Sequence, residues 1–152
     1  MKEIFILLTT FMGIITTARA QTTEDSVKAA VNQLFEGMKK ADGALVKSAF
    51  ADSAIMQTIT RSREGQLMVR TEQVQRFADM VGSQQSGELD ERIQFDVVKV
   101  DGPLASVWTP YKFYFKGQFS HCGVNSFQLV RTNGQWKIQY LIDTRRRSGC
   151  AE

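Results

Sequence analysis

The apolar residues at the start of the folded chain recur with a helical period. From Thr22 to Lys40 they are spaced by three or four positions, which places them on one face of a helix. Acidic residues in the first turn and lysines in the last suit the helix dipole, and Thr22 or Thr23 can cap the N-terminus. The pattern therefore predicts an amphipathic helix over this segment.

Two shorter helices are expected further along. Asp42-Gly43 interrupts the first pattern, and a second helix is predicted at residues 44–50. A third is predicted to begin after Thr71 as its N-cap and to end at Gly82, with Ser83 to Gly87 as a loop.

Strand-like patterns fill the rest of the chain. Residues 54–60 and 65–70 form two short candidates between the second and third helices, and from residue 88 onward alternation dominates. Longer strands are predicted at 104–116, 119–131 and 135–145. Helices followed by a run of strands predict one α+β domain.

The hairpin around Asn133-Gly134 allows a prediction of register. A two-residue turn there pairs residues whose numbers sum to 267, so that Leu129 lies opposite Ile138. Cys122 then lies opposite Arg145. The same alternation places on one buried face Trp136, Ile138, Tyr140, Ile142, Phe127, Leu129, Asn125 and His121. A bulge in either strand would shift the pairing by one residue.

The N-terminus has the pattern of a secretory signal. A short apolar core precedes Ala18-Arg19-Ala20, and we expect cleavage after Ala20. The mature protein is then residues 21–152, a single domain exported to the periplasm or medium without a membrane anchor. The alternative is that residues 4–17 remain as a buried helix or anchor, which leaves the cleavage pattern unexplained.

Charge and composition exclude several classes of function. The whole chain carries a formal charge of +3, and removal of residues 1–20 leaves 17 basic and 15 acidic residues, a charge of +2. So small an excess predicts no nucleic-acid partner, and Arg145-Arg146-Arg147 is expected to be a solvated strand end or tail. One His and two Cys exclude a four-ligand Cys/His zinc site. No cofactor is expected, since no Gly-rich phosphate loop is present.

The two cysteines of an exported chain most simply form one disulfide. A bond between Cys122 and Cys150 would close a loop of 29 residues and tie the C-terminal tail to the body. Two free or buried thiols are the alternative, because spacing alone does not bring the Cβ atoms together.

Several segments resemble the nuclear transport factor 2-like superfamily of cone-shaped α+β domains. The matching segments are Asp42-Gly43, Ala49-Phe50-Ala51-Asp52-Ser53-Ala54, Ala105-Ser106-Val107-Trp108 and Gly134-Gln135-Trp136-Lys137-Ile138. Within that superfamily, residues 121–129, 143–146 and Cys150 look like its SnoaL-like or lumazine-binding-like exported bacterial branch. The resemblance implies N-terminal helices packed on a strongly curved mixed or antiparallel sheet. It implies little about function, because this fold hosts isomerases, dehydratases, cyclases and binding modules.

The interior of the cone is the candidate site. His121 is the side chain whose ordinary pKa lies near neutrality, so it is the candidate general acid or base. The candidate ligand pocket consists of Tyr111, Phe113, His121, Asn125, Phe127, Tyr140 and Thr144. No inward carboxylate is identified: Asp52 and Asp96 are candidates only by proximity, and Asp143 has the opposite parity to His121.

Three functions follow from these residues. The favoured one is an exported, non-catalytic domain that binds a small apolar or aromatic ligand in the cone. The second is a lyase, isomerase or hydratase that uses His121. The third is an interaction or homodimerisation module, because Trp108 and Tyr114 fall on the outer parity of their strand unless a bulge at Thr109-Pro110 reverses it.

Overall fold

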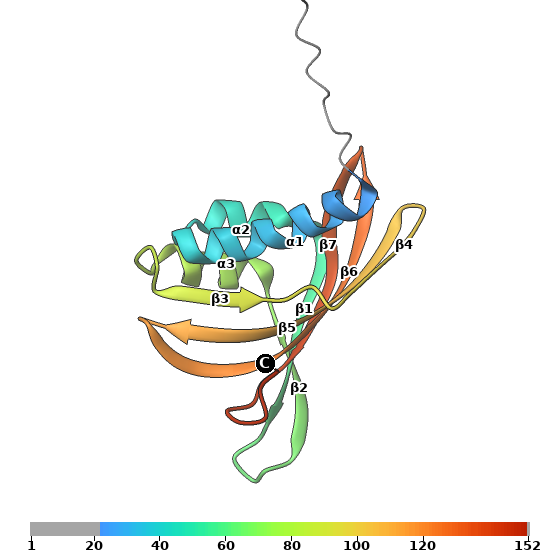
Figure 1. The fold of residues 1–152 in the computed structure, drawn as a ribbon. Helices are drawn as coiled ribbons and strands as arrows, with labels where there is room; N and C mark the ends of the chain where they lie inside the picture. The colour runs from blue at the N-terminus through green and yellow to red at the C-terminus, as the bar shows by residue number, and fades with distance from the viewer. Residues whose placement is uncertain (1–21, 152) are drawn as a thin grey trace, which may run out of the picture.

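The structure is a computed structural model that describes residues 22–151, and it places three helices against one face of a curved sheet (Figure 1). The predicted cleavage site lies outside the described residues. The helices are α1 (Thr23–Lys40), α2 (Gly43–Ala49) and α3 (Val74–Gly82). The strands are β1 (Phe50–Arg61), β2 (Leu67–Glu72), β3 (Leu89–Ile93), β4 (Val97–Asp101), β5 (Leu104–Phe115), β6 (Gln118–Thr132) and β7 (Gln135–Thr144). The predicted α+β class and curved mixed sheet are confirmed.

The start of α1 follows the sequence prediction, whereas the start of α3 does not. Thr22 caps α1 through a reciprocal capping box with Asp25. Helix α3 begins after Gln73, so the prediction of Thr71 as its N-cap was wrong. Thr71 instead pairs with Gln57 in the β1–β2 hairpin, where its hydroxyl accepts a hydrogen bond from the Gln57 amide at 3.1 Å. Thr71 therefore belongs to strand β2 and is not available to cap helix α3.

The strands form one seven-stranded sheet in the order β2-β1-β7-β6-β5-β3, and β4 also pairs with β5. The β1–β7 pair is parallel, and the other pairs are antiparallel. The helices cover the inner, concave face. Apolar side chains between the two layers make the core, with Phe127, Leu34, Leu129 and Ile138 among the largest that are fully buried.

The predicted hairpin register holds only as far as Leu129 and Ile138. A bulge then shifts the pairing, so that Phe127 faces Leu141 and Asn125 faces Asp143. The predicted pairing of Phe127 with Tyr140 was therefore wrong, and Arg146 rather than Arg145 bridges to Cys122. The extra residue exchanges the two faces of β7 beyond residue 139. Leu141 and Asp143 point inward, while Tyr140 and Ile142 point outward.

A matching irregularity in β1 accompanies this bulge. The parallel pairing of β1 with β7 shifts between Phe50 and Ile55, opposite the same part of β7. The side-chain amide of Gln139 donates to the Ser53 carbonyl oxygen at 3.0 Å. This bond satisfies a backbone acceptor that the interrupted ladder leaves free, so the two bulges stabilise each other.

Candidate functional site

A cavity of about 440 Å³ lies between the inner face of the sheet and the helices. Its apolar wall comes from α1 and α3 and includes Leu34, Phe35, Met38, Phe77 and Met80. Its other wall is the sheet, where Phe113 and Leu141 meet a group of polar residues. Apolar walls with a few polar groups are typical of small-molecule sites.

The polar wall contains a row of side chains in register across four strands. Thr58 on β1 pairs with Asp143 on β7, Asp143 with Asn125 on β6, and Asn125 with Thr109 on β5. Each is at most 8% exposed, and in the described part of the chain these four are the buried polar side chains. We call Thr58, Asp143, Asn125 and Thr109 the polar row. All but Thr109 line the cavity.

Thr58 lacks a partner for its hydroxyl. Within residues 22–151, Thr58 Oγ1 is buried and makes no hydrogen bond, and the same holds for Thr109 Oγ1. A buried hydroxyl without a partner costs free energy that a hydrogen bond from a ligand can recover. Since Thr58 lines the cavity, its hydroxyl is placed to make such a bond.

Glu91 extends the polar row from β3. Its Oε1 accepts a hydrogen bond of 2.9 Å from the Asn125 side-chain amide. Burial, reinforced by the negative charge of Asp143, raises the pKa of Glu91 to about 7. The cavity therefore holds a carboxyl group that changes its charge near neutral pH.

Tyr111 on β5 fixes the position of Asp143 in the polar row. Its hydroxyl lies 3.2 Å from Asp143 Oδ2 and 3.0 Å from the Thr144 carbonyl oxygen. Burial, with the charges of Asp143 and Glu91, raises the Tyr111 pKa, so this hydroxyl stays a donor. Arg145 Nε also donates to Asp143 Oδ2, at 2.8 Å. Asp143 is thus held in one orientation by a neutral and a charged donor.

His121 lies on the same wall, beside Tyr111 and Phe113. Its ring stands edge-on to Tyr111, with centroids 5.7 Å apart, and its Nδ1 lies 3.0 Å from Ser120 Oγ. Burial and the nearby Arg145 lower the His121 pKa. The ring is therefore neutral at pH 7 and able to accept a proton.

The residues predicted for the pocket fall into two groups. Phe113, His121 and Asn125 line the cavity. The other four lie outside the lining: Tyr111 binds Asp143, Phe127 is fully buried in the core, Tyr140 donates to Gln57 Oε1, and Thr144 accepts from the Val124 amide. The bulge explains the last two, since Tyr140 and Thr144 lie on the face opposite Asp143.

The two carboxyl groups beside the polar-row amide, Glu91 and Asp143, were not predicted from the sequence. Asp52 and Asp96 are exposed, whereas Glu91 and Asp143 line the cavity. The assignment of Asp143 to the opposite face from His121 was wrong because of the bulge. Glu91 did carry a signal: Leu89, Glu91 and Ile93 share one parity, so a carboxylate stands on the apolar side of an alternating strand.

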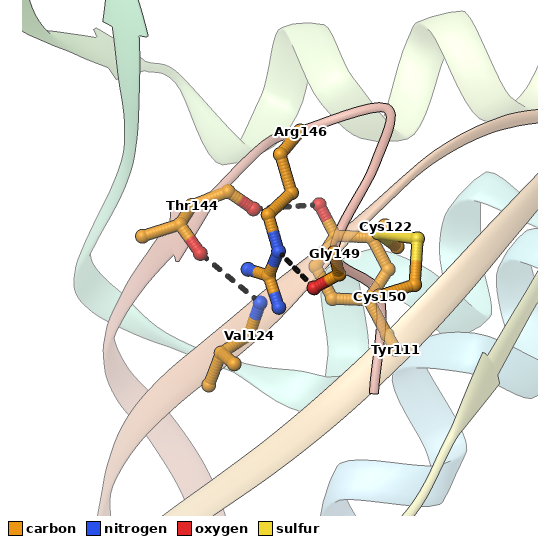
Figure 2. Close-up of a disulfide and its surroundings, with 7 residues drawn as sticks. All are labelled: Tyr111, Cys122, Val124, Thr144, Arg146, Gly149 and Cys150. Atoms are coloured by element: carbon orange, nitrogen blue, oxygen red, sulfur yellow. Dashed lines mark hydrogen bonds between the residues drawn. A yellow bond between two sulfur atoms is a disulfide. The ribbon is translucent and has the colours of Figure 1, made fainter. Parts of the chain in front are cut away.

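The C-terminal tail is fixed beside the site by the predicted disulfide. Cys122 and Cys150 are bonded, with Cα atoms 5.7 Å apart. Figure 2 shows the tail turning back toward β6, where Arg146 Nε donates to the Gly149 carbonyl oxygen at 2.9 Å. Paired amide and carbonyl groups of Cys122 and Arg146, at 2.8 Å, extend the β6–β7 ladder to the end of the cavity wall. Such disulfides are typical of oxidising compartments.

Comparison with known families gives a match over most of the chain. A family model described as "Putative lumazine-binding" matches residues 22–140. The chain belongs to this family. The match spans all three helices and six complete strands, up to the bulged part of β7. The lumazine-binding-like resemblance is thereby confirmed, and Asp143 and Arg145 lie just beyond the matched residues.

Solved structures place this family member in the nuclear transport factor 2-like fold. A nuclear transport factor 2-like protein of unknown function from Shewanella baltica superimposes with a TM-score of 0.63 at 16% identity, over 81% of this chain and 93% of that one. One of the same description from Silicibacter pomeroyi gives 0.60 at 18% identity, over 80% and 93%. A cystatin-like domain of unknown function from Nostoc punctiforme gives 0.64 at 18%, over 84% and 81%. These similarities establish the fold.

The comparison with curated proteins finds no significant match. Among the described residues, none of the helices has the length and apolar character needed to cross a membrane.

Proposed function

We propose that the protein is an exported domain that binds a small molecule in the cone, with the apolar body of the ligand against α1 and α3 and its polar group against the polar row. The observation that carries this proposal is the unpartnered Thr58 hydroxyl in the cavity wall. Beside it, Asp143 and Asn125 are held in place by hydrogen bonds to Tyr111, Arg145 and Glu91. Fixed polar groups on an otherwise apolar surface give orientation and specificity.

Thr58→Val tests the proposal without disturbing the fold. Valine keeps the shape of threonine, and the lost hydroxyl has no partner among the described residues, so stability should not fall. Native mass spectrometry of protein purified from its export compartment should show a small molecule on the wild type. The variant should bind that molecule about 5- to 10-fold more weakly, as expected for the loss of one hydrogen bond.

Thr109→Val is the matched control. It removes a second buried, unpartnered hydroxyl from the same row, but Thr109 does not line the cavity. It should retain the ligand as the wild type does. An empty wild-type protein, or equal retention by both variants, would contradict the proposal.

Acid–base catalysis by His121 is the second candidate function. The observation that favours it is a neutral imidazole on the cavity wall. Once a ligand is identified, His121→Ala should abolish any turnover while changing the free energy of unfolding by less than about 1 kcal/mol, because the ring is only partly buried. Turnover that survives in the variant would exclude this role, and a large loss of stability would assign His121 to the structure.

We also propose a homodimer formed through the outer face of the sheet. Trp108 on β5 is 44% exposed and pairs with Val97 on β4, which is 39% exposed. The β5–β6 register runs without a break through Thr109-Pro110, so Trp108 stays on the outer face. Tyr114 adds little to this patch, because the Arg92 guanidinium covers its ring at 4.2 Å.

The dimer proposal predicts that Trp108→Arg converts a dimer to a monomer in light scattering after size exclusion. An exposed aromatic at the centre of an interface contributes much of its affinity, and a charge there is costly. Phe119→Arg changes a similarly exposed aromatic, 45% accessible, at the start of β6 and away from Trp108 along the strands, and should leave the dimer intact. A monomeric wild type would rule out the interface.

A further inference from the structure

Glu91 is the carboxyl group of the cavity that no cation neutralises. In the described part of the chain it forms no ion pair, and its hydrogen bond is the one that Oε1 accepts from Asn125. Asp143, by contrast, is paired with Arg145 at 2.8 Å. Glu72, the third carboxyl group of the cavity, lies 4.0 Å from Arg76. Glu91 is therefore the carboxyl group of the cavity with an oxygen available to a ligand.

The surroundings of Glu91 favour its protonated form. Besides Asp143 and Arg145, the titratable and charged groups that face the cavity are Arg70 and Glu72 on β2, Arg76 on α3 and His121 on β6, with Tyr111 behind the polar row. Burial has the largest effect and Asp143 adds to it, which gives Glu91 a pKa of about 7. Below this pH the group is a neutral acid that donates a hydrogen bond, and above it the group is an anion that only accepts.

We propose that Glu91 acts as a protonated hydrogen-bond donor to the ligand, and that the ligand carries a neutral carbonyl oxygen, as in a ketone, amide or lactam, on an apolar ring system. This inference rests on the proposed function and specifies the chemistry of the same site. Asn125 holds Oε1 as an acceptor, so the proton resides on Oε2 and points to a partner that accepts.

A proton requirement makes binding dependent on pH. The neutral acid makes up about nine-tenths of Glu91 at pH 6 and roughly 3% at pH 8.5, given its pKa of about 7. The affinity that this hydrogen bond adds should therefore be lost between these pH values, and the change in the protonated fraction sets an upper limit of roughly 30-fold. At the higher pH the Glu91 carboxylate takes up one proton from solvent when the ligand binds, and the ligand itself is not protonated.

Two matched probes test the proposal: 2-acetylnaphthalene, which has a ketone, and 2-ethylnaphthalene, which has no acceptor. Binding to the full mature protein is followed by fluorescence at pH 6 and pH 8.5. We expect the ketone to bind more tightly than the hydrocarbon at pH 6 and to lose this preference at pH 8.5. Glu91→Gln presents an amide donor at both pH values, so this variant should keep the preference throughout. Glu72→Gln, which alters another carboxyl group of the cavity, should retain the wild-type pH dependence.

The outcomes separate this inference from the proposed function. If both probes bind equally at both pH values, the cavity binds ligands but Glu91 is not a donor, and the inference fails alone. The inference is also overturned if Glu72→Gln abolishes the preference for the ketone at pH 6 while Glu91→Gln leaves the wild-type pH dependence unchanged. If neither probe binds the wild type at either pH, the inference and the proposed function both fail.

Discussion

Gly123→Ala is expected to lower the free energy of unfolding by at least about 3 kcal/mol, which is among the largest effects for a single methyl group. A Cβ at this position would lie 1.7 Å from the Thr144 carbonyl oxygen and 2.8 Å from Tyr111 Cε1. The first of these atoms belongs to the backbone and cannot move without breaking the β6–β7 ladder. Gly123 thus provides the space in which the Tyr111 ring crosses β6 to reach Asp143. Chemical denaturation of the variant measures the effect.

Gly82→Ala is the control for this prediction. A Cβ at Gly82 would meet nothing closer than 3.8 Å, and the residue ends helix α3, where alanine is favourable. We expect unchanged or slightly increased stability. A Gly123→Ala variant as stable as Gly82→Ala would show that Gly123 does not lie as close to the Thr144 carbonyl and the Tyr111 ring as described.

Loss of the disulfide is expected to have the second large effect. Cys150→Ser removes the bond between two residues that are 28 positions apart in the sequence. The lost loop-closure entropy corresponds to about 3.6 kcal/mol of unfolding free energy. Cys122 is fully buried, whereas Cys150 is only partly buried, so it is Cys150 that should be changed. Denaturation with and without a reducing agent measures the effect.

The same experiment contains its control. The reduced wild type should match Cys150→Ser, and reduction should not change the variant further. Because the bonded tail lies beside Arg146 and the end of β7, the lost bond should also increase amide exchange at residues 143–146. A variant as stable as the oxidised wild type would mean that the tail is held by its other contacts.

Much of the fold follows from local patterns in the sequence. The period of α1, the turn at Asn133-Gly134 and the alternation along β5 each report on structure within a few residues, and each prediction agrees with the structure. The third helix shows the limit. Thr71 has the chemistry of an N-cap, but pairing with Gln57 on another strand takes precedence.

The site depends on contacts that local patterns do not contain. One extra residue in β7 decides whether Tyr140 or Asp143 faces the cavity, and Ser53, which stabilises that bulge, is 86 residues away in sequence. The polar row likewise joins four strands whose order is set by the whole sheet. Of the site residues that were not predicted, Glu91 could have been identified from the sequence, because it alternates in step with the apolar residues Leu89 and Ile93.

The most direct test of the polar row as a ligand site is nuclear magnetic resonance of the labelled protein with 2-acetylnaphthalene at pH 6. The account predicts shifts of the Asn125 side-chain amide and of the backbone amides of Thr58 and Asp143, while the exposed Trp108 indole stays unchanged. Shifts confined to Trp108 and the outer face, with the signals of the polar row unmoved, would contradict it.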